Sequence, residues 1–227
     1  MTTSGTTDFN LNFAEIAEEA FERAGREMRS GYDLRTARRS MNLMLLEWAN
    51  RGINLWTIEQ GVIPLVTGVA TYSLPADTID LLEHVIRTGS GTTQADLNIT
   101  RISVSTYATI PNKNVSGRPI QLKVNRQIAP EVTVWPVPDN SQPYTLVYWR
   151  LRRMDDAGTG TNTQDVPFRF LPVVVAGLAY YLAMKMPEGA PKIDLLKQEY
   201  EAQWGLASGE DREKAAVRFV PRIMSLR

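Results

Sequence analysis

Hydrophobic residues near the start of the chain recur three or four positions apart, which places them on one face of a helix. This first stripe consists of Phe13, Ile16, Ala17, Ala20, Phe21 and Ala24. Asn12 can cap the helix, with Glu15 at the capping-box position, and Gly25 lies near its end. The pattern therefore predicts an amphipathic helix between Asn12 and Gly25.

A second stripe predicts a helix that runs from near Asp33 to about Asn50 and is ended by Gly52. Its apolar positions are Leu34, Ala37, Met41, Met44, Leu45 and Trp48. Three arginines lie largely on the opposite side of this helix, namely Arg35, Arg38 and Arg39. They either form surface ion pairs or face DNA or an acidic partner, and the sequence leaves both readings open.

From about Leu55 the hydrophobic period changes to two, which is typical of half-buried strands. The alternating runs are residues 71–74, 121–125, 131–135 and 144–149. Clusters of Gly, Pro, Asn and Asp, such as residues 136–140, separate them. This arrangement predicts an antiparallel β domain, a small sandwich or a curled sheet, with a short helix at residues 103–107.

Residues 154–164 are polar and rich in Gly, Thr and Asp, which indicates a flexible linker or loop. Helix is expected to return after this segment, with Asp165 as its cap and Pro167 in its first turn. This apolar helix stops at Met186-Pro187, and a further helix runs from Ile193 past Trp204.

Each terminal pair of helices carries an apolar face too large to leave in water. The simplest solution is an α+β fold in which the two pairs form one helical bundle and the β domain is inserted between them. The expected parts are a first helical half (8–54), the antiparallel β domain (55–152), a linker (153–164), a second helical half (165–214) and an extended C-terminal docking tail (215–227).

The composition limits the kinds of functional site that the chain can contain. The chain has 227 residues, 43% of them hydrophobic, which is enough for a buried core. Lys and Arg number 25, as do Asp and Glu, so contact with nucleic acid would have to come from local patches. There is no cysteine and one histidine, His84, which argues against thiolate catalysis and multi-histidine metal sites. We expect no metal and no cofactor.

The chain shows no pattern of a membrane protein. Residues 1–7 are polar and uncharged, unlike a signal peptide. The longest apolar run, residues 171–184, contains Pro172 and Gly177 and is shorter than the roughly 20 residues that a crossing requires. We interpret it as a buried helix and expect a soluble protein with no membrane partner.

Catalytic motifs are weak. His84 lies on a predicted strand, where its neighbour Glu83 points to the opposite face and cannot orient it. Three carboxylate pairs, at 18–19, 155–156 and 210–211, are interpreted as solvated charge rather than as an acid and base facing across a cleft. A Gly-x-Ser-x-Gly elbow is missing from the sequence. We therefore expect a protein that is not an enzyme.

The last residues form an acid-free segment that is both basic and apolar. Six large apolar side chains would be a liability if they were simply exposed. The segment therefore favours docking on a partner protein over packing on the chain itself or contact with a membrane. The predicted binding residues are Arg218, Phe219, Val220, Arg222, Ile223, Met224, Leu226 and Arg227.

Several short pieces in the same order give the chain a resemblance to a known family. They are residues 45–52 (LLEWANRG), 72–77 (YSLPAD), 117–119 (GRP), 135–139 (WPVPD), 179–183 (AYYLA), and the stretch from Tyr200 through Trp204 to 210–213 (EDRE). The chain resembles the head-to-tail adaptor, or connector, proteins of short-tailed bacteriophages, which include tail tubular protein A and the packaged-DNA stabilisation proteins. The resemblance covers nearly the whole chain.

The resemblance implies a structural virion protein. Such adaptors form a ring, of twelve subunits in known members, beneath the portal protein. The helical part faces the portal, the β domain supports the tail tube or nozzle, and the C-terminal segment docks on the portal. The ring conducts the genome during ejection, so charged residues such as Arg35, Arg38 and Arg39 would face DNA without reading its sequence, or lie between subunits.

The implied location is the neck or tail of the virion, with assembly in the host cytoplasm and with tail fibres or spikes as further neighbours. Two other functions remain open from the sequence. A peptidoglycan-degrading protein would need a facing carboxylate pair, and a host-glycan-binding module would use exposed aromatic residues of the β domain, such as Trp135 or Trp149.

Overall fold

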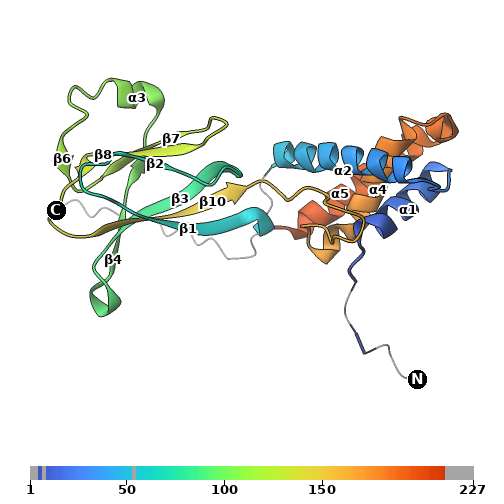
Figure 1. The fold of residues 1–227 in the computed structure, drawn as a ribbon, viewed down its shortest axis with the longest axis horizontal. Coiled ribbons are helices and arrows are strands. Elements are labelled where there is room, and N and C mark those ends of the chain that lie inside the picture. The colour runs from blue at the N-terminus through green and yellow to red at the C-terminus, as the bar shows by residue number, and fades with distance from the viewer. Residues whose placement is uncertain (1–4, 7–8, 53–54, 213–227) are drawn as a thin grey trace, which may run out of the picture.

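The structure is a computed structural model that describes residues 5–6, 9–52 and 55–212. Its long axis runs through two lobes, one of helices and one of strands (Figure 1). Both ends of the chain contribute helices to the first lobe, and the strands come from the segment between them. The expected α+β fold, with a β region inserted into a helical bundle, is confirmed.

The helical lobe is built around its most apolar helix. The N-terminal half supplies α1 (Phe13–Ala24) and α2 (Gly31–Arg51), and the C-terminal half supplies α4 (Leu171–Ala183) and α5 (Ile193–Glu210). Helix α4 contacts each of the other three helices, and nine of its 13 residues are buried. The apolar run at residues 171–184 is therefore a core helix, as its length and composition predict.

The first helix matches its sequence pattern. The Asn12 side chain accepts a hydrogen bond from the Glu15 N–H at 3.0 Å, and the Glu15 carboxylate accepts one from the Asn12 N–H at 2.8 Å. Gly25 ends α1 in the left-handed region at φ 96°, where glycine avoids the strain of a side chain. The six residues of the predicted stripe are the buried residues of α1.

Helix α2 begins two residues before the expected Asp33. The side chain of Ser30 caps it by accepting a bond from the Asp33 N–H. The carboxylate of Asp33 instead turns inward, where it pairs with Arg26 at 3.0 Å and accepts a bond from the Arg29 N–H at 3.1 Å. Because Ser30, three residues before Asp33, supplies the capping oxygen, the helix begins at Gly31 and not at Asp33.

Close packing in this lobe depends on one glycine. A Cβ atom at Gly177 would lie 2.4 Å from the Met44 sulfur and 2.8 Å from the ring of Tyr200. The Trp48 indole N–H donates a buried hydrogen bond of 2.7 Å to the hydroxyl of Tyr200. The absence of a side chain at Gly177 thus lets α4 approach both α2 and α5.

The β lobe is a sandwich of two four-stranded sheets that share one apolar core. The first sheet is antiparallel, in the order β1 (Ile58–Pro64), β10 (Tyr144–Arg152), β3 (Thr78–Thr88) and β4 (Ala95–Asn98). The second has the order β2 (Thr71–Ser73), β8 (Glu131–Trp135), β7 (Gln121–Asn125) and β5 (Thr100–Arg101). Strand β5 runs parallel to β7, and the other pairs of this sheet are antiparallel.

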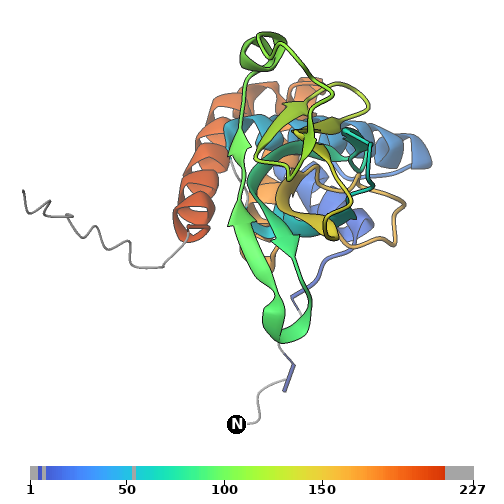
Figure 2. The same ribbon diagram turned by 90° about the vertical axis from the view of Figure 1, so that its left-hand side faces the viewer.

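Smaller elements complete the β lobe. Helix α3 (Val104–Ala108), capped by Ser103, lies where a short helix was expected. Strands β6 (Ser116–Gly117) and β9 (Val137–Pro138) form a short parallel pair. Figures 1 and 2 place α3 at one edge of the lobe and the β3–β4 hairpin at the opposite edge, so both project away from the sandwich.

Residues 153–164 connect the lobes as a loop that is fixed to the helices. The N–H groups of Phe13 and Ala14 donate to the carbonyls of Asn162 and Gly160, each at 2.9 Å. The Asn42 side chain accepts a bond of 2.9 Å from the N–H of Ala157. Hydrogen bonds from α1 and α2 therefore define the path of this segment.

The expected cap of the following helix is wrong. The chain enters α4 through a 3₁₀ turn, η3 (Phe168–Phe170), in which Asp165 caps nothing. The carboxylate of Asp165 pairs with Arg152 of β10 instead. The ion pair with Arg152 thus occupies the carboxylate that the local sequence pattern assigns to a helix cap.

Candidate interaction surfaces

The first candidate surface is the outward side of α2. Arg35, Arg38 and Arg39 are all exposed there, as the stripe predicts. Large apolar side chains accompany them on this side, with exposed fractions of 63% for Tyr32, 56% for Leu43 and 52% for Leu46. We call Tyr32, Arg35, Arg39, Leu43 and Leu46 the α2 face. It combines positive charge with apolar side chains that lie outside the core of the subunit.

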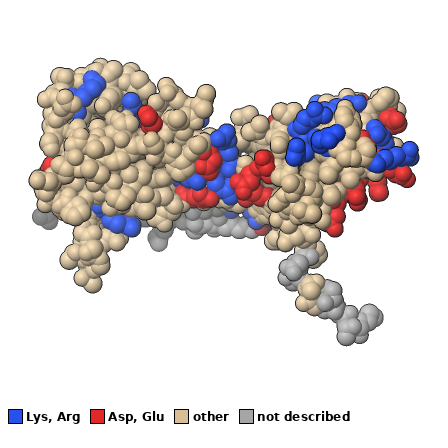
Figure 3. Space-filling view, viewed as in Figure 1, with Lys and Arg blue, Asp and Glu red and all other residues tan. Residues whose placement is uncertain are grey.

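Helix α1 presents the opposite charge. Four exposed glutamates form what we call the α1 face: Glu15, Glu18, Glu19 and Glu22. Beside it, α1 and α4 enclose a groove of about 350 Å³, lined by Leu11, Glu15, Glu19, Arg23, Leu171, Pro172 and Val175. Figure 3 shows Lys and Arg gathered over α2 and Asp and Glu along the edge formed by α1. Charge is thus segregated between two sides of the helical lobe.

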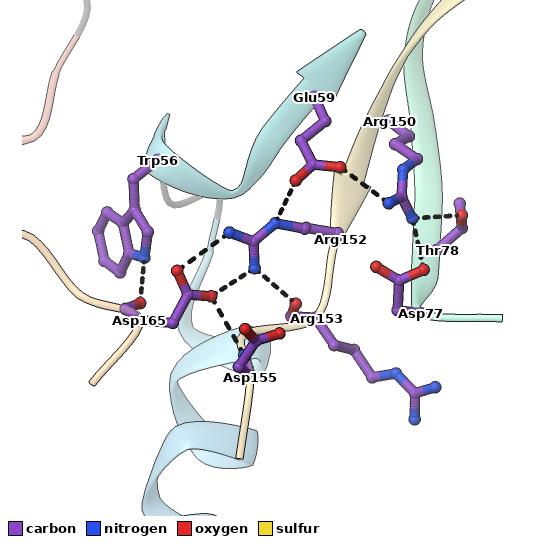
Figure 4. A network of polar contacts seen from close by, with 9 residues as sticks. All are labelled: Trp56, Glu59, Asp77, Thr78, Arg150, Arg152, Arg153, Asp155 and Asp165. Carbon is purple, nitrogen blue, oxygen red and sulfur yellow. Dashed lines mark hydrogen bonds and ion pairs between the residues drawn. The ribbon is translucent and has the colours of Figure 1, made fainter. Parts of the chain in front are cut away.

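The junction between the lobes is held by a network of ion pairs (Figure 4). Its centre is Arg152, which donates to Glu59 of β1 at 2.7 Å and to both carboxylate oxygens of Asp165. The hydrogen bonding of the Arg152 guanidinium to the Asp165 carboxylate is the largest influence on the pKa of Arg152 and raises it. The pair joins the last strand of the β lobe to the segment that enters α4.

A second arginine extends the network within the β lobe. The nearly buried Arg150 donates to Asp77 at 2.7 Å, to Glu59 at 2.8 Å and to the Thr78 hydroxyl at 3.0 Å. Burial by itself would lower the pKa of Arg150, but the bonds to Asp77 and Glu59 outweigh it and raise that pKa. Arg150 in turn lowers the pKa of Asp77. Glu59 therefore bridges the two arginines of β10.

Aromatic side chains pack behind this network. The ring centroids of Trp56 and Phe170 lie 4.5 Å apart, and those of Trp48 and Trp204 lie 5.0 Å apart. The Trp56 indole N–H also donates to the carbonyl of Asp165 at 3.0 Å. Trp56 belongs to η1 (Leu55–Thr57), the turn that leads into the β lobe. Both crossings between the lobes are consequently fixed by aromatic packing as well as by charge.

A cleft of about 370 Å³ lies beside the junction. Its walls come from α2 and from the segments that leave the β lobe, and its lining consists of Asn42, Leu45, Leu46, Ala49, Asp77, Arg153, Met154, Asp155 and Asp156. Leu46 is part of the α2 face and also lines this cleft, so the α2 face extends to the cleft.

The end of the second helical half is anchored at Asp211. The sequence indicates solvated charge at 210–211, and this interpretation is wrong for Asp211, which is only 9% exposed, whereas Glu210 is exposed. Its carboxylate accepts a bond of 3.0 Å from the Leu55 N–H and pairs with Arg169. The end of α5 is thereby tied to both lobe crossings. The eight predicted binding residues of the tail lie outside the described residues.

The candidate catalytic residues do not come together. His84 lies on β3 opposite Tyr148 in the register, and burial lowers its pKa. Glu83 lies opposite Trp149, the next position along the strand. Within the described ranges, no group of three or more His, Asp or Glu side chains could hold a metal ion. Trp135 and Trp149 are half-buried, and the Trp135 indole N–H donates to the Asn112 carbonyl at 3.2 Å.

A search for membrane spans among the described helices found none that is apolar over a sufficient length.

A comparison with protein families identifies the chain. A sequence model of the SU10 adaptor protein family matches residues 11–222. The chain belongs to the SU10 adaptor protein family. It is therefore a structural adaptor protein of a bacteriophage and a component of the virion. No curated protein matches the chain.

The match spans both halves of the helical lobe, the β lobe between them and the tail as far as Arg222. An adaptor binds other components of the virion, so the surfaces described above are its candidate functional sites. The bacteriophage adaptor class indicated by the sequence resemblance is confirmed.

The junction network was missed from the sequence, although one signal was present. Arg150 and Arg152 follow the predicted strand at 144–149 directly and are two positions apart, a spacing that favours the same face of a sheet if the strand continues. Two neighbouring arginines on a largely apolar strand require acidic partners when they are partly buried. Those partners, Glu59 and Asp165, lie far away in sequence, and only the fold identifies them.

Proposed function

We propose that this adaptor forms a ring that joins the portal protein to the tail tube or nozzle and lines part of the DNA channel. The observation that carries the proposal is the two-lobed shape with a fixed junction. Two chemically different lobes at opposite ends of one long axis can each contact a different neighbour (Figure 1). This is the role of tail tubular protein A and of the packaged-DNA stabilisation proteins, with twelve subunits in the ring.

The contacts at the junction favour a subunit whose two lobes resist separation. Arg152 binds carboxylates on both sides of the crossing, and Trp56 adds a hydrogen bond to the same segment. A charged pair with several partners resists separation of the lobes more strongly than an isolated surface pair does. A ring subunit between a filled head and a tail needs that resistance, because a hinge there would uncouple the two partners during DNA ejection.

We assign the helical lobe to the portal side and the β lobe to the tail side. The portal-binding residues proposed in the tail are Arg218, Phe219, Val220, Arg222, Ile223, Met224, Leu226 and Arg227. Asp211 supports this assignment, because it fixes the point from which the tail leaves the helical lobe. The ring would lie in the neck of the virion after assembly in the host cytoplasm, with tail fibres or spikes as neighbours below.

Electron microscopy of the adaptor mixed with the portal protein of the same genome tests the proposal. We expect a ring of added density at one end of the portal, with twelvefold symmetry on averaging. A chain that ends at residue 214 is expected to fold but to leave the portal bare. A full-length Lys197→Ala variant, changed on an exposed position of α5, is the control and should bind normally.

Two outcomes contradict this assignment. Bare portals in the presence of folded full-length chain would remove the adaptor ring as the function. Normal rings from the truncated chain would leave the ring in place but exclude the tail as its portal contact.

A further inference from the structure

The α2 face has positive charge that the subunit does not neutralise. Arg35, Arg38 and Arg39 form no ion pair with any residue that the structure describes, and Arg39 donates only to the Thr36 hydroxyl, at 3.3 Å. Lys185 lies nearby and donates a hydrogen bond of 2.6 Å to the Ser40 hydroxyl of α2, and burial, followed by the charge of Arg39, lowers the pKa of Lys185. Tyr32, Leu43 and Leu46 extend from the same side. A partner for this face must therefore be acidic and must also accept apolar side chains.

The other side of the lobe meets both requirements. Glu18 and Glu22 on α1 form no ion pair within the described part of the chain. The adjoining groove is lined by Leu11, Leu171, Pro172 and Val175 together with Glu15, Glu19 and Arg23, and Arg23 is paired with Glu19. Apolar side chains that enter this groove would carry their neighbouring arginines to the glutamates.

The two surfaces also match in spacing. Arg35 and Arg39 are four residues apart on one helix, and Glu18 and Glu22 are four apart on the other. Four residues of helix span about 6 Å along the axis, so both charges of one pair can meet both charges of the other. Two helices can pack side by side at this spacing while Leu43 and Leu46 fill the groove.

The surfaces lie on different sides of the same lobe, as Figure 3 shows for the charges. A contact between unlike surfaces of identical chains is heterologous, and each copy keeps one free surface for the next copy. Such contacts generate a ring when the rotation between copies closes. The arrangement therefore repeats around an axis without any further partner.

We infer that the α2 face of one copy docks into the groove and glutamates of the α1 face on the next copy. The partner is thus a second copy of this chain, and the inference rests on the proposed ring. It assigns Arg35 and Arg39 to the contact between subunits and not to the wall that faces DNA. It also identifies α1 and α4 as the receiving side.

Charge reversal with rescue tests this contact. The first variant is Arg35→Glu with Arg39→Glu, and the second is Glu18→Lys with Glu22→Lys. Glu15 and Glu19 are left intact because they form the capping box and the ion pair with Arg23. Within each variant both faces have the same sign, so we expect self-association to weaken by about 100-fold or more at 0.1 M salt.

Mixing the two variants restores complementarity, because every face then meets its opposite on the other variant. An equimolar mixture is expected to form rings in which the variants alternate. Native mass spectrometry counts the copies of each variant on the portal protein of the same genome, and sedimentation velocity measures self-association without the portal. A carbodiimide should also link the lysines introduced at positions 18 and 22 to the glutamates introduced at 35 and 39.

Two further variants control for charge and for folding. Arg118→Glu with Lys197→Glu reverses two exposed charges elsewhere and should assemble as the unchanged chain does. Leu43→Asp alters an exposed position of the α2 face and should weaken association without loss of helix. Circular dichroism establishes that each chain is folded.

These experiments test the docking contact and the proposed adaptor ring separately. Failure of the unchanged chain to load on the portal would contradict the proposed function. Normal loading and normal self-association of both reversal variants would overturn the docking contact while the adaptor ring stands, as would a loss in each variant that mixing does not restore. Loss of duplex DNA binding by the Arg35 and Arg39 variant, with normal loading, would instead identify the α2 face as a DNA surface and also overturn it.

Discussion

The two lobes obtain their cores from very different lengths of chain. In the helical lobe, the buried hydrogen bond between Trp48 and Tyr200 joins positions 152 apart, so its core closes only when the C-terminal helices return. The β lobe draws its strands from residues 58–152 alone. The inserted lobe is therefore self-sufficient in its contacts, whereas the helical lobe depends on long-range closure.

Their surfaces differ as well. On the face that Figure 3 draws, the β lobe shows few charged side chains and the helical lobe shows separate positive and negative areas. The β lobe also exposes single apolar side chains, among them Ile128 at 99% and Val104 at 66%. Separate areas of opposite charge, which favour directional contacts, are thus visible on the helical lobe, which is consistent with its proposed place between neighbouring subunits.

The largest expected effect is the loss of Trp48. Trp48→Ala would remove a fully buried ring and leave the Tyr200 hydroxyl without its donor, at a cost of about 3–5 kcal/mol in the free energy of unfolding. Hydrogen exchange followed by mass spectrometry should quicken across all four helices of the bundle and much less in β3 and β10. Equal acceleration in both lobes would show that they unfold as one unit.

The reverse experiment uses Leu146, which is fully buried in the β lobe. Leu146→Ala is expected to cost about 3 kcal/mol, through lost burial and the cavity that remains. Exchange should then quicken in the sandwich while α4 stays protected. Val62→Ala, at an exposed position of β1, is the control and should change stability by less than about 0.5 kcal/mol. Loss of protection in α4 would contradict the self-sufficiency of the helical core.

A smaller effect is expected at the junction, where the two lobes are coupled. Arg152→Ala would leave the Asp165 carboxylate unpaired and Glu59 with Arg150 as its remaining partner, which should cost about 2 kcal/mol because the site is only partly exposed. Arg152→Lys keeps the charge but cannot reproduce the forked hydrogen bonds, so only part of the stability should return. The urea transitions of the two lobes should lie further apart than in the unchanged chain. Transitions at unchanged positions would mean that the network does not couple the lobes.

The smallest expected effect concerns acid. Arg150 lowers the pKa of Asp77 in the folded protein below the value of about 3.9 for an unfolded chain. The stability that this pair contributes is therefore fully present above about pH 4 and is lost as the pH falls through the folded pKa. Asp77→Asn should flatten the acid dependence of β-lobe stability between pH 5 and pH 3, measured by urea unfolding. An unchanged slope would remove Asp77 from the acid response.

Local patterns predicted much of the fold. The stripe on α1, its capping box and its glycine end are all present in the structure, because each depends on residues within one or two turns of helix. The alternating runs at 121–125 and 131–135 became neighbouring strands for the same reason, since a strand needs only its own period of two and a partner.

Predictions about individual carboxylates failed where distant residues compete for them. Asp165 was assigned to a helix cap and Asp211 to solvent, yet Arg152 and Arg169 bind them. A guanidinium held close by the fold offers a carboxylate stronger, charge-assisted bonds than a nearby backbone N–H or water can. The spacing of residues in the sequence does not indicate which arginine will lie beside a given carboxylate in the fold.

The sequence by itself thus determined the helices, the strands, the apolar faces and the family of this adaptor, because periodicity, capping and family motifs are properties of neighbouring residues. Only the tertiary structure decided which charges pair across the junction. It also placed Arg35 and Arg39 of α2 and Glu18 and Glu22 of α1, which form no ion pair with any described residue, on different sides of one lobe. Those arrangements depend on the angles at which packed elements meet, and these angles are set by the burial of the whole apolar surface at once.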